Sequence, residues 1–147
     1  CEDCCEDELL VICAPGSPLA KNKELTPQLL ATHPFVSREP GSGTREVTDN
    51  YFRAAGVPPE SLNIVIELGS PEAIKGVVET GIGFAIVSRA SVFKEKRLGD
   101  LLAIPLMPRL NRTLSMVYPK EKFRSRLVNT FVEFANVKLK QFAAKQG

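Results

Sequence analysis

The chain has 147 residues, of which 44% are hydrophobic, and 19 Lys and Arg against 17 Asp and Glu leave a net charge of +2. This balance excludes a disordered or fibrous chain and gives no basic surface typical of nucleic-acid binding. The longest apolar runs, such as residues 82–87, fall far short of the roughly 20 residues of a membrane span. We therefore expect a soluble, cytoplasmic protein with no membrane partner.

All four cysteines lie near the start of the chain, at positions 1, 4, 5 and 13. None lies elsewhere to pair with them across the fold, so no disulfide framework is expected. Cys1 and Cys4 have a spacing found in zinc sites, but no second pair or nearby histidine completes four ligands, and we expect no metal. Residues 1–8 also carry five carboxylates. They indicate a solvated acidic leader whose exposed thiols could oxidise or join two chains.

The first structured elements are a strand and a short helix. Residues 8–14 form an apolar run that predicts a buried strand, ended by the Pro15-Gly16-Ser17-Pro18 turn. Residues 26–30 then predict a short helix, with Thr26 as its cap and Pro27 at its first position.

Strands and helices alternate in the middle of the chain. Strands are predicted at residues 35–38, 62–68 and 81–88, and helices at residues 45–55, from 70 onward and at 90–98. This order predicts a parallel sheet with helices on both faces. Two more strands follow at 101–106 and 113–118. A long closing helix is expected to bury a stripe of Phe123, Leu127, Phe131, Phe134, Ala135, Leu139 and Phe142.

Two turns at the ends of strands could bind a small anion. In the turn at residues 38–44, the glycines allow tight geometry and Ser42 or Thr44 can cap the next helix, whose N-terminus attracts negative charge. Ser70 caps a second helix in the same way. Because both turns follow strands of a parallel sheet, we expect them to share one cavity. The alternative is that these residues only turn the chain and cap the helices.

Arg38 has two possible roles beside this cavity. Its planar guanidinium suits two oxygens of a carboxylate, sulfate or phosphate, or it could instead pair with Glu39 or Glu67. No histidine, cysteine or carboxylate cluster accompanies the hydroxyls, so we expect binding without catalysis. The glycines do not have the spacing of phosphate-binding or dinucleotide-binding loops, and no cofactor is expected.

Three segments carry a family resemblance. PFVSREPGSGTR (residues 34–45), ELGSPEAI (67–74) and GIGFAIVSR (81–89), preceded by PGSPLA (15–20), resemble the effector-binding domain of LysR-type transcriptional regulators. The resemblance covers residues 8 to about 144. It implies an α/β fold like the type 2 periplasmic binding proteins, in which the lobe built on the parallel sheet is complete and the other lobe is partial. Residues 1–8 would be the leader, 35–99 the second lobe, and 9–34 with 100–144 a remnant of the first.

The resemblance also implies a function. A small, anionic metabolite would bind in the cleft between the lobes and would be contacted by Arg38, Ser42, Gly43, Thr44, Gly69 and Ser70. DNA would be bound only through an N-terminal domain outside this sequence, in a parent that is a homodimer or tetramer. The alternatives are an extracytoplasmic solute-binding protein of the same fold and an enzyme on that fold, such as a deaminase or dehydratase.

Overall fold

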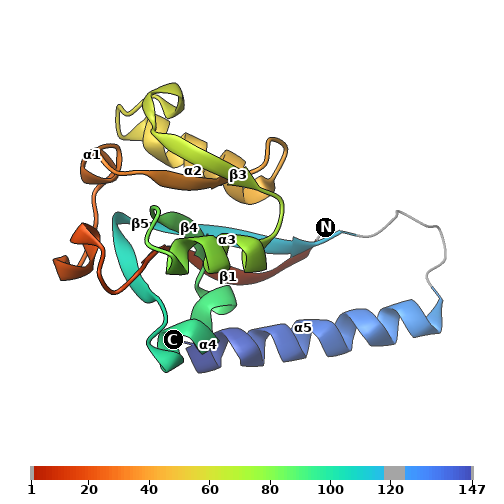
Figure 1. Ribbon diagram of the computed structural model, residues 1–147. Coiled ribbons are helices and arrows are strands. Elements are labelled where there is room, and N and C mark those ends of the chain that lie inside the picture. Colours follow the sequence, from red (N-terminus) through yellow and green to blue (C-terminus); the bar gives the residue numbers. More distant parts are fainter. Residues whose placement is uncertain (1, 118–124, 147) are drawn as a thin grey trace. The chain divides into compact units, whose positions relative to one another are not determined.

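The computed structural model describes residues 2–117 and 125–146 of the chain (Figure 1). Within these residues, three short 3-10 helices, Pro18–Lys21, Pro59–Ser61 and Arg89–Val92, join the main elements. The strands are β1 (Glu2–Cys13), β2 (Phe35–Arg38), β3 (Ile64–Leu68), β4 (Ala85–Ser88) and β5 (Leu102–Met116). The helices are α1 (Pro27–Leu30), α2 (Gly43–Ala54), α3 (Pro71–Glu79), α4 (Phe93–Leu98) and α5 (Arg126–Gln146).

The chain divides into two compact units. One consists of Glu8–Leu110, and the other of Cys1–Asp7 with Asn111–Gly147. Strands β1 and β5 each run from one unit into the other. The expected leader and lobe boundaries stay a prediction, although residues 9–12, expected in the first lobe, pair with β4 of the expected second lobe.

Parallel pairing forms the centre of the Glu8–Leu110 unit. Strand β2 runs parallel to β3, from Phe35 opposite Ile64 to Arg38 opposite Leu68, and Phe35 also makes a parallel bridge to Phe84, just before β4. These pairings confirm the predicted parallel arrangement. The sequence did not predict that β1 would join β4 in the antiparallel direction, in a sheet of order β4-β1-β5.

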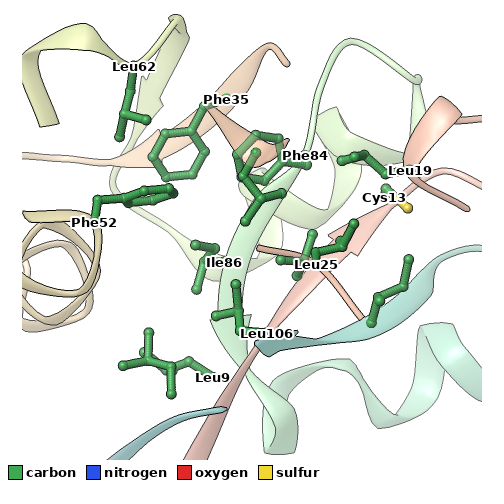
Figure 2. Packing of buried hydrophobic residues seen from close by; sticks show 14 of the residues in the cluster. Leu9, Cys13, Leu19, Leu25, Phe35, Phe52, Leu62, Phe84, Ile86 and Leu106 are labelled. Atoms are coloured by element: carbon green, nitrogen blue, oxygen red, sulfur yellow. The ribbon is translucent and has the colours of Figure 1, made fainter. Parts of the chain in front are cut away.

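Alternating side chains of the strands make two cores, one on each face. Phe35 stacks on Phe84 with 4.8 Å between the ring centroids and lies 6.2 Å from Phe52 of α2 (Figure 2). The next residue, Val36, belongs to the other cluster, together with Ile74 of α3. Because successive side chains of a strand point to opposite faces, α2 and α3 cover opposite faces of the sheet. This confirms the predicted placement of helices on both sides.

The start of β1 differs from the expected solvated leader. Asp7 is only 8% exposed and its carboxylate accepts from Arg112 Nε at 2.8 Å. The carboxylate of Glu8 pairs with Arg89 at 3.0 Å and with Arg109. The ion-pair partners lie 81 to 105 residues away along the chain, so the local excess of acid did not reveal them.

The cysteines do not form an exposed thiol cluster among the described residues. Cys4 and Cys13 are buried and Cys5 is half-buried, all three as free thiols. Burial raises the pKa of the Cys5 and Cys13 thiols, which lowers the fraction present as reactive thiolate. Within residues 2–117 and 125–146, no three His, Cys, Asp or Glu side chains gather closely enough to hold a metal ion.

The C-terminal part of the chain differs from the prediction in two ways. Strand β5 is continuous, so the two strands expected at 101–106 and 113–118 are one element up to Met116. Helix α5 is present, but the expected buried stripe is wrong: Val132 is 7% exposed, whereas Leu127 and Phe131 are 79% and 64% exposed. In the described part of this unit only the ends of β1 and β5 accompany α5, too little apolar surface to cover the stripe. Phe123 lies outside the described residues.

None of the helices in the described ranges is long and apolar enough to cross a membrane.

The close approach of two segments at Gly83 gives a test of this packing. A β-carbon at position 83 would lie 2.5 Å from the carbonyl oxygen of Pro34 and 2.9 Å from its carbonyl carbon. We expect Gly83→Ala to lower the free energy of unfolding by about 1–3 kcal/mol, because the backbone before β2 must move. Gly76→Ala is the matched control. Position 76 is in α3 with open space around it, so alanine should stabilise by up to about 1 kcal/mol. Urea unfolding of both variants checks the pair, and equal stabilities would contradict the described contact.

Candidate functional site

The two predicted turns lie side by side. Strands β2 and β3 end at the register partners Arg38 and Leu68, and the amide of Glu39 donates to the carbonyl of Leu68 at 3.3 Å. The turn leading to α2 and the turn leading to α3 therefore leave the same edge of the parallel pair. Since α2 and α3 go to opposite faces, the two strand ends form a topological switch point, where open α/β sheets bind ligands.

The N-terminus of α2 is built by the glycine-rich turn. Gly41 has a φ of +89°, a conformation that side-chain-bearing residues rarely adopt. Ser42, 8% exposed, caps the helix: its Oγ accepts from the amide of Arg45 at 3.5 Å, and its own amide donates to the carbonyl of Glu39 at 3.2 Å. Thr44, which was the other candidate cap, lies half-buried within the first turn of α2.

The N-terminus of α3 has the composition that the sequence predicted. Ser70 Oγ accepts from the amide of Ala73 at 3.4 Å, Pro71 takes the first helical position and Glu72 lies in the first turn. Gly69 and Ser70 are exposed. The amide groups of a first helical turn have no partner within the helix, and they attract negative charge together with the helix dipole. Two such ends meet at this edge of the sheet.

Arg38 is paired with its neighbour in sequence. Its Nε donates to one carboxylate oxygen of Glu39 at 2.8 Å and its Nη2 to the other at 3.1 Å. The hydrogen bond from Arg38 holds the pKa of the Glu39 carboxyl below its ordinary value, and the same bond raises the pKa of Arg38. Of the alternatives open for Arg38, the structure shows pairing with Glu39. Contact with an effector stays a prediction.

Arg45 has a role that the sequence analysis missed. Its Nη1 donates to the carbonyl of Arg38 at 3.0 Å and to the Glu67 carboxylate, and its Nε lies 3.7 Å from the Asp49 carboxylate. Arg45 therefore ties α2 to the ends of both β2 and β3. The spacing of Arg45 and Asp49, four residues apart on a helix, was the available signal for part of this network.

A hollow of about 400 Å³ runs along α2 from the glycine-rich turn. It brings Ser42 together with Arg45, but its lining does not include the other predicted site residues, Arg38, Gly43, Thr44, Gly69 and Ser70. Its lining is Pro40, Gly41, Ser42, Arg45, Glu46, Asp49, Asn50 and Arg53. That both turns share one cavity stays a prediction.

The position of α3 is secured by a lysine that is 5% exposed. Lys75 Nζ donates to the Glu95 carboxylate at 2.7 Å and to the carbonyl of Ser91 at 2.9 Å, and it pairs with the exposed Glu72 at 2.8 Å. The hydrogen bond from Lys75 lowers the pKa of Glu95. Burial lowers the pKa of Lys75, but its bonds to Glu72 and Glu95 outweigh that effect and the net shift is upward. The sequence showed only the Glu72–Lys75 spacing.

A doubly covered parallel strand pair with two capped helix N-termini at one edge is the arrangement at which open α/β sheets bind small molecules. Residues 1–139 match the family described as the LysR substrate binding domain. The chain belongs to this family.

Two curated relatives are 39% and 32% identical to this chain over the aligned residues. It is 39% identical over 133 residues to the HTH-type transcriptional regulator YeiE of Escherichia coli strain K12, covering 89% of this chain and 44% of the relative. It is 32% identical over 131 residues to the HTH-type transcriptional activator CmpR of Synechocystis, covering 88% of this chain and 42% of the relative. The chain thus spans less than half the length of these relatives.

Solved structures have the same fold. The CcmR regulatory domain of Synechocystis PCC6803, in complex with 2-PG, matches with a TM-score of 0.83 and 26% identity, covering 95% of this chain and 66% of that one. The effector-binding domain of QuiR, in complex with shikimate, matches with a TM-score of 0.81 and 21% identity, covering 95% of this chain and 65% of that one. These likenesses confirm the predicted fold class.

Removing the Lys75 ammonium should destabilise the unit. Lys75→Met leaves the Glu95 carboxylate without its ammonium partner. The Oε2 atom of Glu95 is already buried with no hydrogen-bond partner. We expect a loss of about 3 kcal/mol in the free energy of unfolding. The double variant Lys75→Met/Glu95→Leu should recover most of this loss, whereas Lys23→Met, at an exposed position, should change little. Urea unfolding measures all three, and a double variant no more stable than Lys75→Met would contradict the pairing.

Acid should weaken the same pair. The pKa of Glu95 in the folded chain lies below its ordinary value of 4.5, so the folded state binds fewer protons than the unfolded state in that range. The stability that this carboxylate contributes is complete above pH 4.5 and is lost as the pH falls through the folded pKa. Unfolding of Glu95→Gln should therefore depend less on pH below 4.5 than unfolding of the unchanged chain. Parallel pH profiles of the two proteins would contradict this expectation.

Proposed function

We propose that this chain is the effector-sensing domain of a LysR-type transcription regulator and that it binds a small anionic metabolite. The observation that carries the proposal is the meeting of two capped helix N-termini at the ends of the adjacent parallel strands β2 and β3. The positive end of a helix dipole at each N-terminus attracts an incoming anion, and α2 adds first-turn amides. In α3, Pro71 has no N–H and the amide of Ala73 donates to Ser70, so the first-turn amide left for an anion is that of Glu72.

The family and the relatives support this proposal. Membership in the LysR substrate binding domain family places the chain among binding domains, and the relatives named above are HTH-type transcription regulators. They favour a regulator over an extracytoplasmic solute-binding protein or an enzyme. The CcmR and QuiR domains bind 2-PG and shikimate. Shikimate is a carboxylate, and a ligand of similar charge suits the two helix ends described here.

The residues of the two turns have different roles in binding the anion. Ser42 and Ser70 cap their helices and so hold the first-turn amides in place. Gly43 and Gly69 have no side chain to cover the backbone, which lets a ligand approach the amides closely. Thr44 contributes a hydroxyl in the first turn of α2, and Arg38 contributes the guanidinium at the end of β2.

In the parent protein this binding would control transcription. The effector must bind one arrangement of the lobes or subunits more tightly than another, because only differential affinity shifts an equilibrium between states. The shift would change how a separate N-terminal domain contacts DNA in the cytoplasm. We expect the parent to be a homodimer or tetramer, and we assign no catalytic step to this chain.

Two hydroxyl deletions test the site. Thr44→Ala and Ser70→Ala should each weaken the binding of inorganic sulfate, measured by calorimetric titration. The loss of stability should be no more than about 1 kcal/mol, which is the effect of the missing cap in Ser70→Ala. Thr26→Ala is the matched control: Thr26 caps α1 by accepting from the amide of Leu29 at 3.3 Å, so its loss should lower stability by a similar amount without changing sulfate binding. Unchanged affinity in both site variants would show that the assignment is wrong.

A further inference from the structure

The Arg38 guanidinium, which we expect to bind an effector anion, already binds the carboxylate of Glu39. Both oxygens of the Glu39 carboxylate accept from Arg38, at 2.8 and 3.1 Å, in the bidentate geometry with which arginine binds carboxylates and phosphates. An external carboxylate, sulfate or phosphate would use the same donors in the same arrangement. Glu39 and an anionic effector therefore cannot both occupy this side of Arg38.

Glu39 is also placed between the two turns. Its amide donates to the carbonyl of Leu68, and its carbonyl accepts from the amide of Ser42. Its side chain extends over Gly69: a β-carbon at that position would lie 3.9 Å from the carboxyl carbon of Glu39. The carboxylate thus lies where the ends of α2 and α3 come together, and 40% of the side chain is exposed to solvent.

The neighbouring cation is engaged in the same way. Arg45 pairs with Glu67 and lies 3.7 Å from Asp49. Around the two strand ends, the cations Arg38 and Arg45 thus face the carboxylates Glu39, Asp49 and Glu67. An anion that enters this edge meets no net positive charge from these five side chains, and it gains the Nε and Nη2 donors of Arg38 only by displacing the Glu39 carboxylate.

This inference rests on the anion site proposed above. We propose that Glu39 is an internal competitor: its carboxylate competes with an effector anion for the Arg38 guanidinium and so sets which anions the site selects. An effector must exchange with the Glu39 carboxylate on the Arg38 guanidinium, and only an anion with two suitably spaced oxygens reproduces both hydrogen bonds. Carboxylates, sulfate and phosphate meet this condition and chloride does not. Glu39 is the displaced group because it lies between the turns, whereas Glu67 and Asp49 hold Arg45.

Glu39→Gln tests the exchange directly. The amide keeps the size of the side chain but loses the charge, so sulfate should bind about three- to fivefold tighter, the range expected for removing an exposed ion pair. Binding is followed by titrating sulfate into the isotope-labelled chain and observing the backbone amide signals of Gly43 and Gly69. Chloride at the same ionic strength should not give saturable shifts. Glu60→Gln removes one charge in the 3-10 helix before β3 and should leave the sulfate affinity unchanged.

A second substitution separates exchange on Arg38 from a general effect of charge. In the Arg38→Met background, Glu39→Gln should no longer improve sulfate binding, because the guanidinium for which Glu39 competes is gone. An equal improvement with and without Arg38 would overturn the exchange and leave only long-range repulsion.

The remaining outcomes distinguish this proposal from the one on which it rests. If the unchanged chain and Glu39→Gln bind sulfate equally well at Gly43 and Gly69, the role of Glu39 is overturned while the anion site stands. If sulfate shifts neither amide signal in any variant, the anion site itself is overturned, and the competitor role with it.

Discussion

The parallel pairing of β2 with β3 is the constraint on which the candidate site depends. Because the two strands run in the same direction, from Phe35 beside Ile64 to Arg38 beside Leu68, both chains leave the sheet at the same edge. An antiparallel pair would have placed one turn at each end. The hydrogen bond from Glu39 to Leu68 extends the pairing by one residue into the turns, so the backbone itself sets their separation.

The division of β2 between two cores then opens that edge. Phe35 packs with Phe52 of α2 on one face, and Val36 packs with Ile74 of α3 on the other. Burial of both side chains requires the two helices to lie on opposite sides of the sheet. Each helix starts beside the strand end and turns away from the other helix. The hydrophobic core, rather than any polar contact, therefore places the N-termini of α2 and α3 at the same edge of the sheet while the helices lie on opposite faces.

Local chemistry in the sequence was enough to predict most elements, and long-range pairing was not. The caps at Thr26 and Ser70 were predictable because capping depends on residues within one helical turn. The antiparallel entry of β1 beside β4, and the burial of Asp7 against Arg112, depend on partners far along the chain. A run of acidic residues looks solvated until its arginines are known. The apolar face of α5 shows the reverse case, since periodicity identified the helix but could not say what would cover it.

The sequence predicted that the two turns would lie at one edge of the sheet, but it did not predict how the charges there would pair. The sequence allowed Arg38 to bind a ligand or to pair with a neighbouring carboxylate, and the structure shows the second without removing the first. A carboxylate on the adjacent residue has no translational freedom to lose when it pairs, whereas a free anion does. Glu39 therefore has an entropic advantage in competing for the Nε and Nη2 donors of Arg38. A ligand can replace it only by adding contacts that Glu39 does not make, and in the proposed site the first-turn amides of α2 and the Glu72 amide of α3 would supply them. Selectivity at such a site follows from the difference in free energy between binding of the effector anion and binding of Glu39 to the same arginine. The charge of the arginine alone does not set it.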